Sequence, residues 1–374
     1  MKPDNHKHLV VIRNSDLHRD IRVPKEIEVL SNDYKITFLG WNREGKENDF
    51  PNLKGCYDVV FFNFKAAYDK KILKILPIWW IYIFLKLIFI NFDILHVFNL
   101  DSVFPAILVA KIKNKKIIYE VLDTYEDQII LNKSLRKIII LIDKLFLYCS
   151  DAVILADEAQ IAEFEGIPNK KIIPIYDSPP DISQVLKKNK NKNFVLFYAG
   201  ILFKNRSLNI ERVIEAINDI EGIELIIAGD GDLVSTIKNY EEIFPGKIKY
   251  IGRIDYITSL KNYYSSDCAF VLRDPAIPIN KYICGSTLLN AMMCGKPVLV
   301  NKGTSTANKV LEENCGLVVD ANNIKEIRDA IVMLRDNPEL CKELGANGRR
   351  AYEERYSWKI MEQRLLGLYR VLIG

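Results

Sequence analysis

Residues 278–300 have the sequence PINKYICGSTLLNAMMCGKPVLV and combine a loop, a short helix and a buried strand. The apolar spacing predicts a helix from Thr287 to Cys294, and Gly295 is expected to end it. The short apolar run from Pro297 to Val300 is typical of a strand that is buried on both faces. A helix that is followed at once by a buried strand indicates one unit of a parallel α/β sheet.

The turn at the start of this helix, Gly285-Ser286-Thr287, is the first candidate binding site. Ser286 or Thr287 is expected to cap the helix, because a hydroxyl there can accept a hydrogen bond from a first-turn N–H group. The backbone N–H groups of the turn point the same way, so they can hold an anion such as a phosphate. Asn290 lies about one turn further on, where its amide can hydrogen-bond a sugar hydroxyl. An ordinary capped helix without a ligand is the alternative interpretation.

The same alternation of short apolar runs and helical stretches continues through the whole chain. Seven runs before the middle are expected to be strands, at residues 9–12, 35–40, 58–62, 94–98, 116–120, 151–155 and 171–174. Six runs after it are expected to be strands, at residues 194–198, 225–228, 248–251, 268–272, 297–300 and 317–319. The pattern predicts two doubly wound α/β domains, each a parallel sheet with helices on both faces, and a ligand cleft between their strand ends.

The boundary between the two domains is expected near Ser178-Pro179-Pro180, since prolines interrupt helices and strands. Residues 187–193, KKNKNKN, contain no apolar side chain, which is typical of a solvated linker. We therefore predict four segments: an N-terminal domain at 1–180, a linker at 181–193, a C-terminal domain at 194–356 and a final helix at 357–374.

Composition and charge exclude several classes of protein. Hydrophobic residues make up 49% and charged residues 27% of the 374 residues, which is globular composition. A net charge of +4 allows an anionic ligand, but it does not demand nucleic acid, and no nucleic-acid partner is predicted. The seven cysteines form no CxxC pair or metal-ligand spacing, so we expect a reduced, cytoplasmic protein without structural zinc. The sequence begins without an apolar signal core and contains no P-loop or HExxH motif.

Residues 72–90 form an unusually apolar segment. It has no charge between Ile75 and Leu85 and contains Trp79, Trp80, Tyr82 and Phe84 close together. The segment is too short, and too broken by Pro77 and Lys86, to predict a spanning helix. Contact with the inner face of the cell membrane is one interpretation, because aromatic and lysine side chains favour the lipid–water boundary. Burial in a core or a subunit interface is the other.

Loops that follow strand ends carry the ligands of open parallel sheets, and two such loops in the second half contain suitable cations. The loop from Gly200 to Ser207 combines a glycine turn with Lys204 and Arg206, whose guanidinium can hold two phosphate oxygens. Arg273 follows the strand that precedes the 285–287 turn. Two cations and a helix start would stabilise the negative charge that develops on a departing diphosphate.

Gly229-Asp230-Gly231-Asp232 follows another strand of the second half. It is not a GxGxxG motif, because Val234 takes the place of the third glycine, so dinucleotide binding is not supported. Its Asp-x-Asp pair can chelate Mg²⁺ on a diphosphate, whereas a tight turn that packs beside the nucleotide is the favoured interpretation. We predict no metal site and no cofactor, since cations of the chain can do the same work.

The first half offers other polar side chains. His96 and Asp123 are expected at strand ends that face the cleft, where His96 can hydrogen-bond a sugar hydroxyl and Asp123 can orient or deprotonate an acceptor hydroxyl. A structural role inside the protein is the alternative for His96. The candidates for acceptor binding in the loops at the same edge are Asn14, Arg19, Arg22 and Asp101.

Several strings of the second half resemble a known family. They are FYAGILFKNRSL (197–208), IIAGDGD (226–232), YIGRI (250–254), NAMMCGKPVLV (290–300), CGLVV (315–319) and DNPELCKELGANGRRAYEERYSW (336–358). They are similar to the donor-binding domain of family-4 glycosyltransferases, also described as glycosyl transferases group 1. The first half matches more loosely, through RDIRVPKE (19–26), DILHVFNLD (93–101) and IIYEVLD (117–123). This family has the GT-B fold of two Rossmann-like domains and acts with retention at the anomeric carbon, and its final helix crosses back to the N-terminal domain.

The resemblance implies roles for the donor-site residues. Arg206, Lys204 and the amides of 285–287 would hold the diphosphate, Asn290 would hold the ribose, and the backbone at Gly229 and Arg253 would lie near the base. The sequence also departs from the family pattern, in which a Glu-x7-Glu pair stands where this chain has Tyr282 and Asn290, and an arginine where it has Ile201. We read these departures as an altered donor site.

The sequence as a whole predicts a retaining hexosyltransferase-type enzyme. It would move a sugar from a nucleotide-diphosphate donor to a glycan or a lipid-linked acceptor in glycan biosynthesis, in the cytoplasm or as a peripheral protein on the inner face of the cell membrane. Two alternatives remain at this point. One is a nucleotide-sugar epimerase of the same fold, and the other is a degenerate glycosyltransferase that serves as a non-catalytic subunit.

Overall fold

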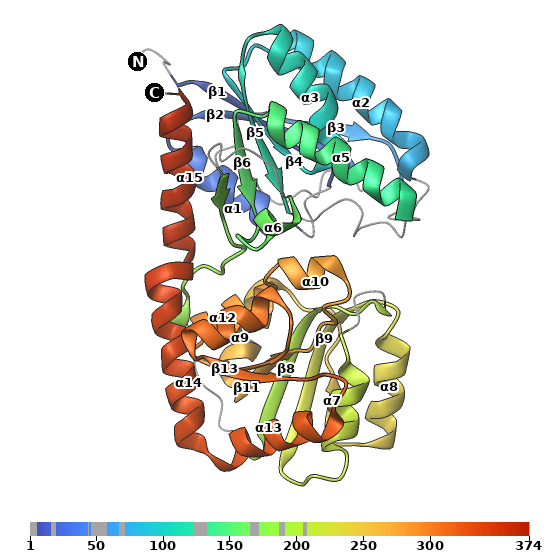
Figure 1. Ribbon diagram of the computed structural model, residues 1–374, viewed down its shortest axis with the longest axis vertical. Coiled ribbons are helices and arrows are strands. Elements are labelled where there is room, and N and C mark those ends of the chain that lie inside the picture. The colour runs from blue at the N-terminus through green and yellow to red at the C-terminus, as the bar shows by residue number, and fades with distance from the viewer. Residues whose placement is uncertain are drawn as a thin grey trace. The chain divides into compact units, whose positions relative to one another are not determined.

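The computed structural model describes residues 6–15, 20–43, 45, 58–66, 72–122, 133–164, 172–186, 191–204 and 208–373. The chain divides into two compact units. The first unit comprises Met1–Ile175 together with Glu362–Gly374, and the second comprises Tyr176–Met361. Each unit contains its own parallel sheet (Figure 1). The prediction of two doubly wound α/β sheets is therefore confirmed.

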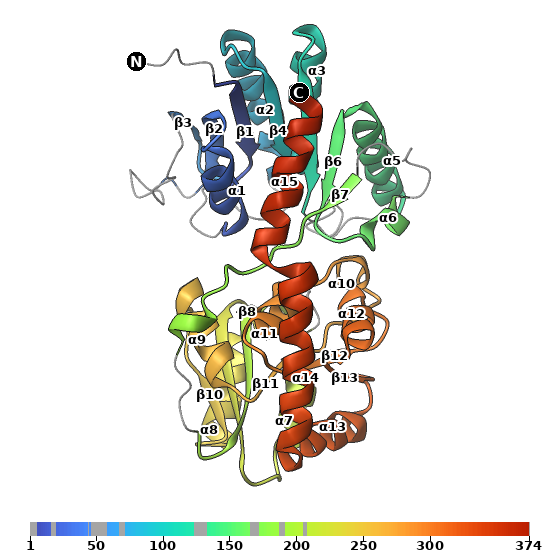
Figure 2. The same ribbon diagram turned by 90° about the vertical axis from the view of Figure 1, so that its left-hand side faces the viewer.

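The first unit has a seven-stranded sheet in the order β3-β2-β1-β4-β5-β6-β7. Its strands are β1 (His8–Arg13), β2 (Lys35–Asn42), β3 (Asp58–Asn63), β4 (Ile94–Phe98), β5 (Lys116–Val121), β6 (Ala152–Leu155) and β7 (Ile172–Pro174). Its helices are α1 (Arg22–Leu30), α2 (Ile72–Phe89), α3 (Leu100–Ile112), α5 (Lys133–Cys149), α6 (Gln160–Glu163) and most of α15 (Trp358–Ile373). Helices α1 and α15 cover one face of the sheet, and α2, α3 and α5 cover the other (Figures 1 and 2).

The second unit has a six-stranded sheet in the order β10-β9-β8-β11-β12-β13. Its strands are β8 (Phe194–Ile201), β9 (Ile223–Asp230), β10 (Ile248–Tyr250), β11 (Cys268–Val271), β12 (Val298–Asn301) and β13 (Gly316–Val319). Its helices are α7 (Ile210–Ile217), α8 (Val234–Ile243), α9 (Tyr256–Ser265), α10 (Pro278–Tyr282), α11 (Ser286–Met293), α12 (Ser305–Glu313), α13 (Ile324–Asp336) and α14 (Pro338–Ala351).

Each sheet has one point where the strand order reverses. In the first unit β1 and β4 are neighbours, and in the second unit β8 and β11 are neighbours. The connections on the two sides of such a point run away from each other, which leaves a crevice outside the carboxyl ends of the two strands. Strands β11 and β12 are buried along their whole length, as expected of central strands with both faces covered.

A close backbone contact fixes α14 against the residue that ends α11. A Cβ added at Gly345 of α14 would lie 2.2 Å from the carbonyl oxygen of Gly295. We therefore expect Gly345→Ala to lower the free energy of unfolding by about 1–3 kcal/mol, the usual range for overpacking. Gly367 of α15 is the control, because a Cβ there meets nothing within 4 Å. Gly367→Ala should raise stability by up to about 1 kcal/mol through helix propensity, and calorimetric melting of both variants tests the contrast.

Candidate functional site

The start of α11 lies on the loop side of the point where β8 and β11 meet. Gly285 is the N-cap residue, with φ −70° and ψ 148°, and no side chain caps the helix. The expectation that Ser286 or Thr287 caps it is wrong. Ser286 is already helical and exposed, and the hydroxyl of Thr287 is buried. In the part of the chain that the structure describes, no group accepts a hydrogen bond from the backbone N–H groups of Ser286 and Thr287. They are therefore available to an anion.

Two neighbouring helices hold α11 in place. Near its N-terminal end, the Tyr263 hydroxyl of α9 donates to Thr287 Oγ1 over 3.4 Å. At its C-terminal end, Arg349 of α14 donates to the carbonyl oxygen of Met293 over 2.7 Å and also forms an ion pair with Asp181. Arg349 belongs to the string 336–358, so this stretch positions the helix that carries the candidate anion site.

Arg273 brings a cation to the same turn. A Cβ built on Gly285 would lie 3.5 Å from both Cζ and Nη1 of Arg273, so the guanidinium lies beside the start of α11. The Arg273 Nε is buried and has no hydrogen-bond partner among the described residues. The backbone is fixed separately, since Asn301 Nδ2 donates to the Arg273 carbonyl oxygen over 2.9 Å. A buried donor without an acceptor costs stability, and an anion bound at Gly285 would supply the acceptor.

The glycine-rich turn after β9 packs directly on the end of β8. Gly229 has a φ of 143°, and a Cβ there would lie 1.9 Å from the carbonyl oxygen of Gly200. Asp232 Oδ1 accepts from the backbone N–H of Lys204 over 2.7 Å, and the Gly229 N–H donates to the carbonyl oxygen of Gly252 over 2.9 Å. These contacts agree with the tight-turn interpretation of residues 229–232. They also bring the exposed Arg253, which follows Gly252, to the same edge of the sheet.

Asn290 lies one turn into α11, as expected, but its side chain is only 4% exposed. The hydroxyl of Tyr256 donates to Asn290 Oδ1 over 3.3 Å, so α9 already uses the amide oxygen. The contact between Asn290 and a sugar hydroxyl stays a prediction. Arg206 falls outside the described residues, as do Asp123 and Arg19 of the first unit.

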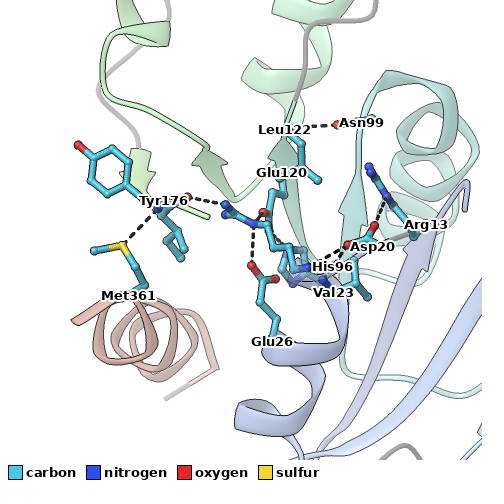
Figure 3. Close-up of polar contacts among 12 residues, drawn as sticks. Arg13, Asp20, Val23, Glu26, His96, Asn99, Glu120, Leu122, Tyr176 and Met361 are labelled. Atoms are coloured by element: carbon cyan, nitrogen blue, oxygen red, sulfur yellow. Dashed lines mark hydrogen bonds and ion pairs between the residues drawn. The ribbon is translucent and has the colours of Figure 1, made fainter. Parts of the chain in front are cut away.

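A polar group also lies at the reversal point of the first sheet, after β1 and β4. Asn14 Nδ2 donates to Asp101 Oδ2 over 2.8 Å, and Asn14 Oδ1 is buried without a partner among the described residues. Burial raises the pKa of the Asp101 carboxyl. Nearby, Arg13 pairs with Asp20 over 3.0 Å, and Asn99 Oδ1 accepts from the backbone N–H of Leu122 (Figure 3). The structure thus brings together two of the four residues predicted for acceptor binding.

Comparison with known proteins finds a family similarity for the second unit. Residues 179–351 match the family described as Glycosyl transferases group 1. This part of the chain is therefore similar to the group 1 glycosyltransferases. A relative from Corynebacterium glutamicum, a GDP-mannose-dependent monoacylated alpha-(1-6)-phosphatidylinositol monomannoside mannosyltransferase, is 29% identical over 147 residues, which are 39% of this chain and 38% of the relative. The chain spans about half the length, or less, of the curated relatives it matches.

Two solved structures resemble the fold of the whole chain. A sucrose-phosphate synthase from Thermosynechococcus elongatus has a TM-score of 0.80 and 17% identity, over 98% of this chain and 99% of that one. Anabaena Alr3699/HepE in complex with UDP has a TM-score of 0.73 and 14% identity, over 98% of this chain and 100% of that one. The predicted GT-B fold class is confirmed by these likenesses.

His96 lies inside the first unit, and the expectation of a strand-end position that faces the cleft is wrong. It is the central residue of β4 and is 1% exposed. Its Nε2 lies 2.7 Å from Glu120 Oε2, and its Nδ1 lies 2.9 Å from the hydroxyl of Tyr369 in α15. Both ring nitrogens therefore contact other side chains of the protein. This agrees with the alternative interpretation, in which His96 has a structural role inside the protein.

Arg22 is also buried, at 3% exposure, so its predicted contact with an acceptor is wrong. Its Nε donates to Glu26 Oε1 over 2.9 Å and pairs with Glu120, and its Nη1 donates to the Ile175 carbonyl oxygen over 2.6 Å. Figure 3 shows Glu26, Glu120 and His96 gathered at this point. Sequence reasoning missed both glutamates, although a charged residue inside the apolar strand KIIYEV was a usable signal for Glu120.

Protons balance the charge of this buried cluster. Burial, with the Glu120 carboxylate nearby, raises the pKa of Glu26 to about 8, so Glu26 is neutral at pH 7. Burial lowers the pKa of His96 to about 4, so the imidazole is neutral as well. Burial also raises the pKa of Glu120, whereas the Arg22 guanidinium beside it acts in the opposite direction. The ligand atoms of Glu26, His96 and Glu120 lie within 4.8 Å of one another, a spacing that can hold a metal ion, but the Arg22 guanidinium already supplies the cation there.

The proton on Glu26 predicts a pH dependence of stability. Between pH 6.5 and 8 a glutamate in the unfolded chain is ionised, whereas folded Glu26 keeps its proton up to a pKa of about 8. Folding therefore takes up a proton, and the stability that this proton supplies is lost as the pH rises. We expect wild-type stability, relative to Glu26→Gln, to fall by about 1–2 kcal/mol from pH 6.5 to pH 8. Urea unfolding at both pH values measures it, and a constant difference would contradict a neutral Glu26.

Proposed function

We propose that the chain is a retaining glycosyltransferase that moves a sugar from a nucleotide-diphosphate donor to a glycan or lipid-linked acceptor. The observation that carries this proposal is the buried, unpaired Nε of Arg273 beside the uncapped start of α11. The similarity of residues 179–351 to the group 1 glycosyltransferases supports this reaction class. A diphosphate is the anion that would meet both the guanidinium and the free backbone N–H groups.

The diphosphate would be held by donors that this unit presents at one edge of its sheet. The backbone N–H groups of Ser286 and Thr287 would donate to one phosphate, and Arg273 would donate to its neighbour. When the bond between the anomeric carbon and the diphosphate oxygen breaks, negative charge develops on that oxygen, and these fixed donors stabilise it. Arg206 and Lys204 would add cations from the loop after β8. No metal ion is required for this step.

The remaining donor contacts are assigned by position. Gly229 and Arg253 lie at the ends of β9 and β10 and would contact the base through their backbone, and Asn290 would face the ribose through the amide nitrogen that Tyr256 leaves unused. One similar protein is named as GDP-mannose-dependent, and one solved structure is described as a complex with UDP. Both ligands contain a nucleoside diphosphate, which supports the diphosphate as the shared element and leaves the base open.

The acceptor would bind at the reversal point of the first sheet. Asn14 Oδ1 is buried without a partner among the described residues and can accept a hydrogen bond from a sugar hydroxyl, while Asp101 fixes the Asn14 side chain over 2.8 Å. Asp123 remains our candidate for the group that orients or deprotonates the attacking hydroxyl of the acceptor.

We place the activity in the cytoplasm, in keeping with the six free cysteines among the described residues.

An assay of donor turnover tests the proposed reaction. The purified chain would be incubated with a panel of nucleotide-diphosphate sugars, with and without lipid-linked and glycan acceptors, and nucleoside diphosphate and sugar products would be measured. We expect nucleoside diphosphate release that depends on one acceptor class and a product with the anomeric configuration of the donor. An epimerised donor without nucleotide release, or tight nucleotide binding without turnover, would overturn the proposal.

A further inference from the structure

Helix α2 is apolar on two opposite sides. One side packs into the core of the first unit through Ile72, Leu76, Trp79, Ile83 and Leu87, each at most 6% exposed. The other side carries Ile78, Ile81, Leu85 and Phe89, which are 47%, 60%, 52% and 84% exposed. These four side chains repeat at helical spacing and form a continuous exposed stripe. A surface helix normally has a polar outer face, so this stripe needs an explanation.

The exposed apolar surface continues over the two neighbouring helices. In α3 the exposed side chains are Phe104, Leu108 and Ile112, and in α5 they are Ile138, Leu141, Ile142, Leu145 and Tyr148. Phe104 joins the three helices, since its ring lies 5.2 Å from that of Trp80 in α2 and 5.8 Å from that of Phe146 in α5. We call the exposed residues of α2, α3 and α5 the three-helix face; Figure 1 shows these helices side by side.

The charged side chains of these helices have one sign at the surface. The two acidic residues, Asp101 and Asp143, are 6% and 1% exposed. The other charged side chains described in α2, α3 and α5 are all lysines, namely Lys74, Lys86, Lys111, Lys137 and Lys144. A wide apolar surface with only cations among it matches a layer that is apolar inside and anionic at its boundary.

We propose that the three-helix face binds the surface of an anionic lipid bilayer, with α2, α3 and α5 lying in the plane of the headgroups. The apolar stripes would enter the boundary with the acyl chains, and the lysines would meet the anionic headgroups. The inference extends the apolar segment 72–90 to two further helices. It goes beyond the proposed function, because binding to lipid requires no sugar transfer.

Helix α2 has the length and hydropathy of a spanning helix, with 18 residues and a mean hydropathy of 2.0. Spanning would, however, pull Trp79, Ile83 and Leu87 out of the core, where all three are fully buried.

A second copy of the chain is a less suitable partner for the three-helix face than a lipid surface is. A symmetric contact would bring the same patch of each copy together, so lysines would face lysines.

Flotation of the full-length chain with lipid vesicles tests this inference. The vesicles would contain phosphatidylcholine alone, or phosphatidylcholine with about 30% phosphatidylglycerol. We expect binding to the anionic vesicles, weaker binding to the neutral ones, and a loss of binding as salt is raised to about 0.5 M, where the Debye length falls to a few ångströms. Equal recovery with both kinds of vesicle, or no recovery with either, would overturn the proposal.

Two pairs of variants distinguish loss of lipid contact at the three-helix face from the effect of making the same substitutions elsewhere on the surface. Ile81→Ser/Leu85→Ser/Phe89→Ser should lower partitioning into anionic vesicles by at least about tenfold. Its matched control changes exposed apolar residues of the second unit, Ile243→Ser/Leu311→Ser/Met333→Ser, which are 63%, 66% and 48% exposed, and it should bind like wild type. Lys86→Gln/Lys111→Gln should weaken binding several-fold, whereas Lys325→Gln/Lys342→Gln should leave it unchanged.

Light scattering of the same samples without lipid measures their oligomeric state and so tests whether the three-helix face binds a second copy of the chain. A dimer that the triple serine variant of α2 disrupts, together with absent vesicle binding, would assign the face to self-association and overturn the lipid proposal. If the serine variant melts early, the two lysine pairs still decide the question, because all four of these lysines lie at the surface. Donor turnover in detergent-free solution is a separate readout, so failure of either proposal can be recognised.

Discussion

Arg273→Ala should lower kcat/KM for the nucleotide-sugar donor about 100- to 1,000-fold, the usual effect of removing one preorganised donor from a developing negative charge. The guanidinium lies beside Gly285, and its Nε is buried without a partner among the described residues, so it is already aimed at the place where an anion would bind. Because charge on the diphosphate grows as the sugar leaves, most of the loss should be in kcat.

Matched variants make the Arg273 result specific. Arg273→Lys keeps the charge but loses the forked donor pair, so it should recover only part of the rate. Arg335→Ala removes an arginine that pairs with Asp336 at the surface of the same unit, and it should leave the rate unchanged. Steady-state kinetics over a range of donor concentrations give both constants. A wild-type kcat/KM for Arg273→Ala would remove Arg273 from the donor site.

The second large effect concerns the stability of the first unit. Glu26→Gln/Glu120→Gln should lower its free energy of unfolding by about 3–5 kcal/mol, because the buried Arg22 then has no carboxylate. Each single change should cost far less. The amide introduced by Glu26→Gln resembles the neutral acid that Glu26 already is at pH 7, and in Glu120→Gln the Glu26 carboxyl can ionise and replace the lost partner of Arg22.

A double-mutant cycle in urea measures this coupling. Three of the four tryptophans, Trp41, Trp79 and Trp80, lie in the first unit, so tryptophan fluorescence follows that unit. The expected interaction energy is at least about 1 kcal/mol beyond the sum of the single effects. Additive effects of the two changes would show that the glutamates do not share Arg22.

The sequence alone predicted the strand, turn and helix that carry the candidate site of the second unit, because these elements follow one another locally along the chain. A strand end, the Gly285-Ser286-Thr287 turn and a helix follow one another, and a parallel sheet brings such turns to one edge. The position of Arg273 follows from the same rule. The capping residue was predicted wrongly, since the helix begins one residue earlier than the hydroxyl pattern indicates and Gly285 is the N-cap.

The first unit was harder to predict because its polar residues pair over long distances in the sequence. Arg22 and Glu120 are 98 positions apart, yet they form a buried ion pair. An arginine close to a strand end resembles a phosphate ligand until its partners are known. His96 was misplaced for the same reason, since its partners Glu120 and Tyr369 come from β5 and α15.

Calorimetric titration of the wild-type chain tests the central claim most directly. Uridine and guanosine diphosphates would each be compared with the matching nucleoside. If Arg273 and the N–H groups that open α11 hold the diphosphate, one diphosphate should bind at least about 100-fold more tightly than its nucleoside, since a hydrogen bond to a charged group contributes about 1.5–3 kcal/mol. Equal affinity of diphosphate and nucleoside would contradict the account.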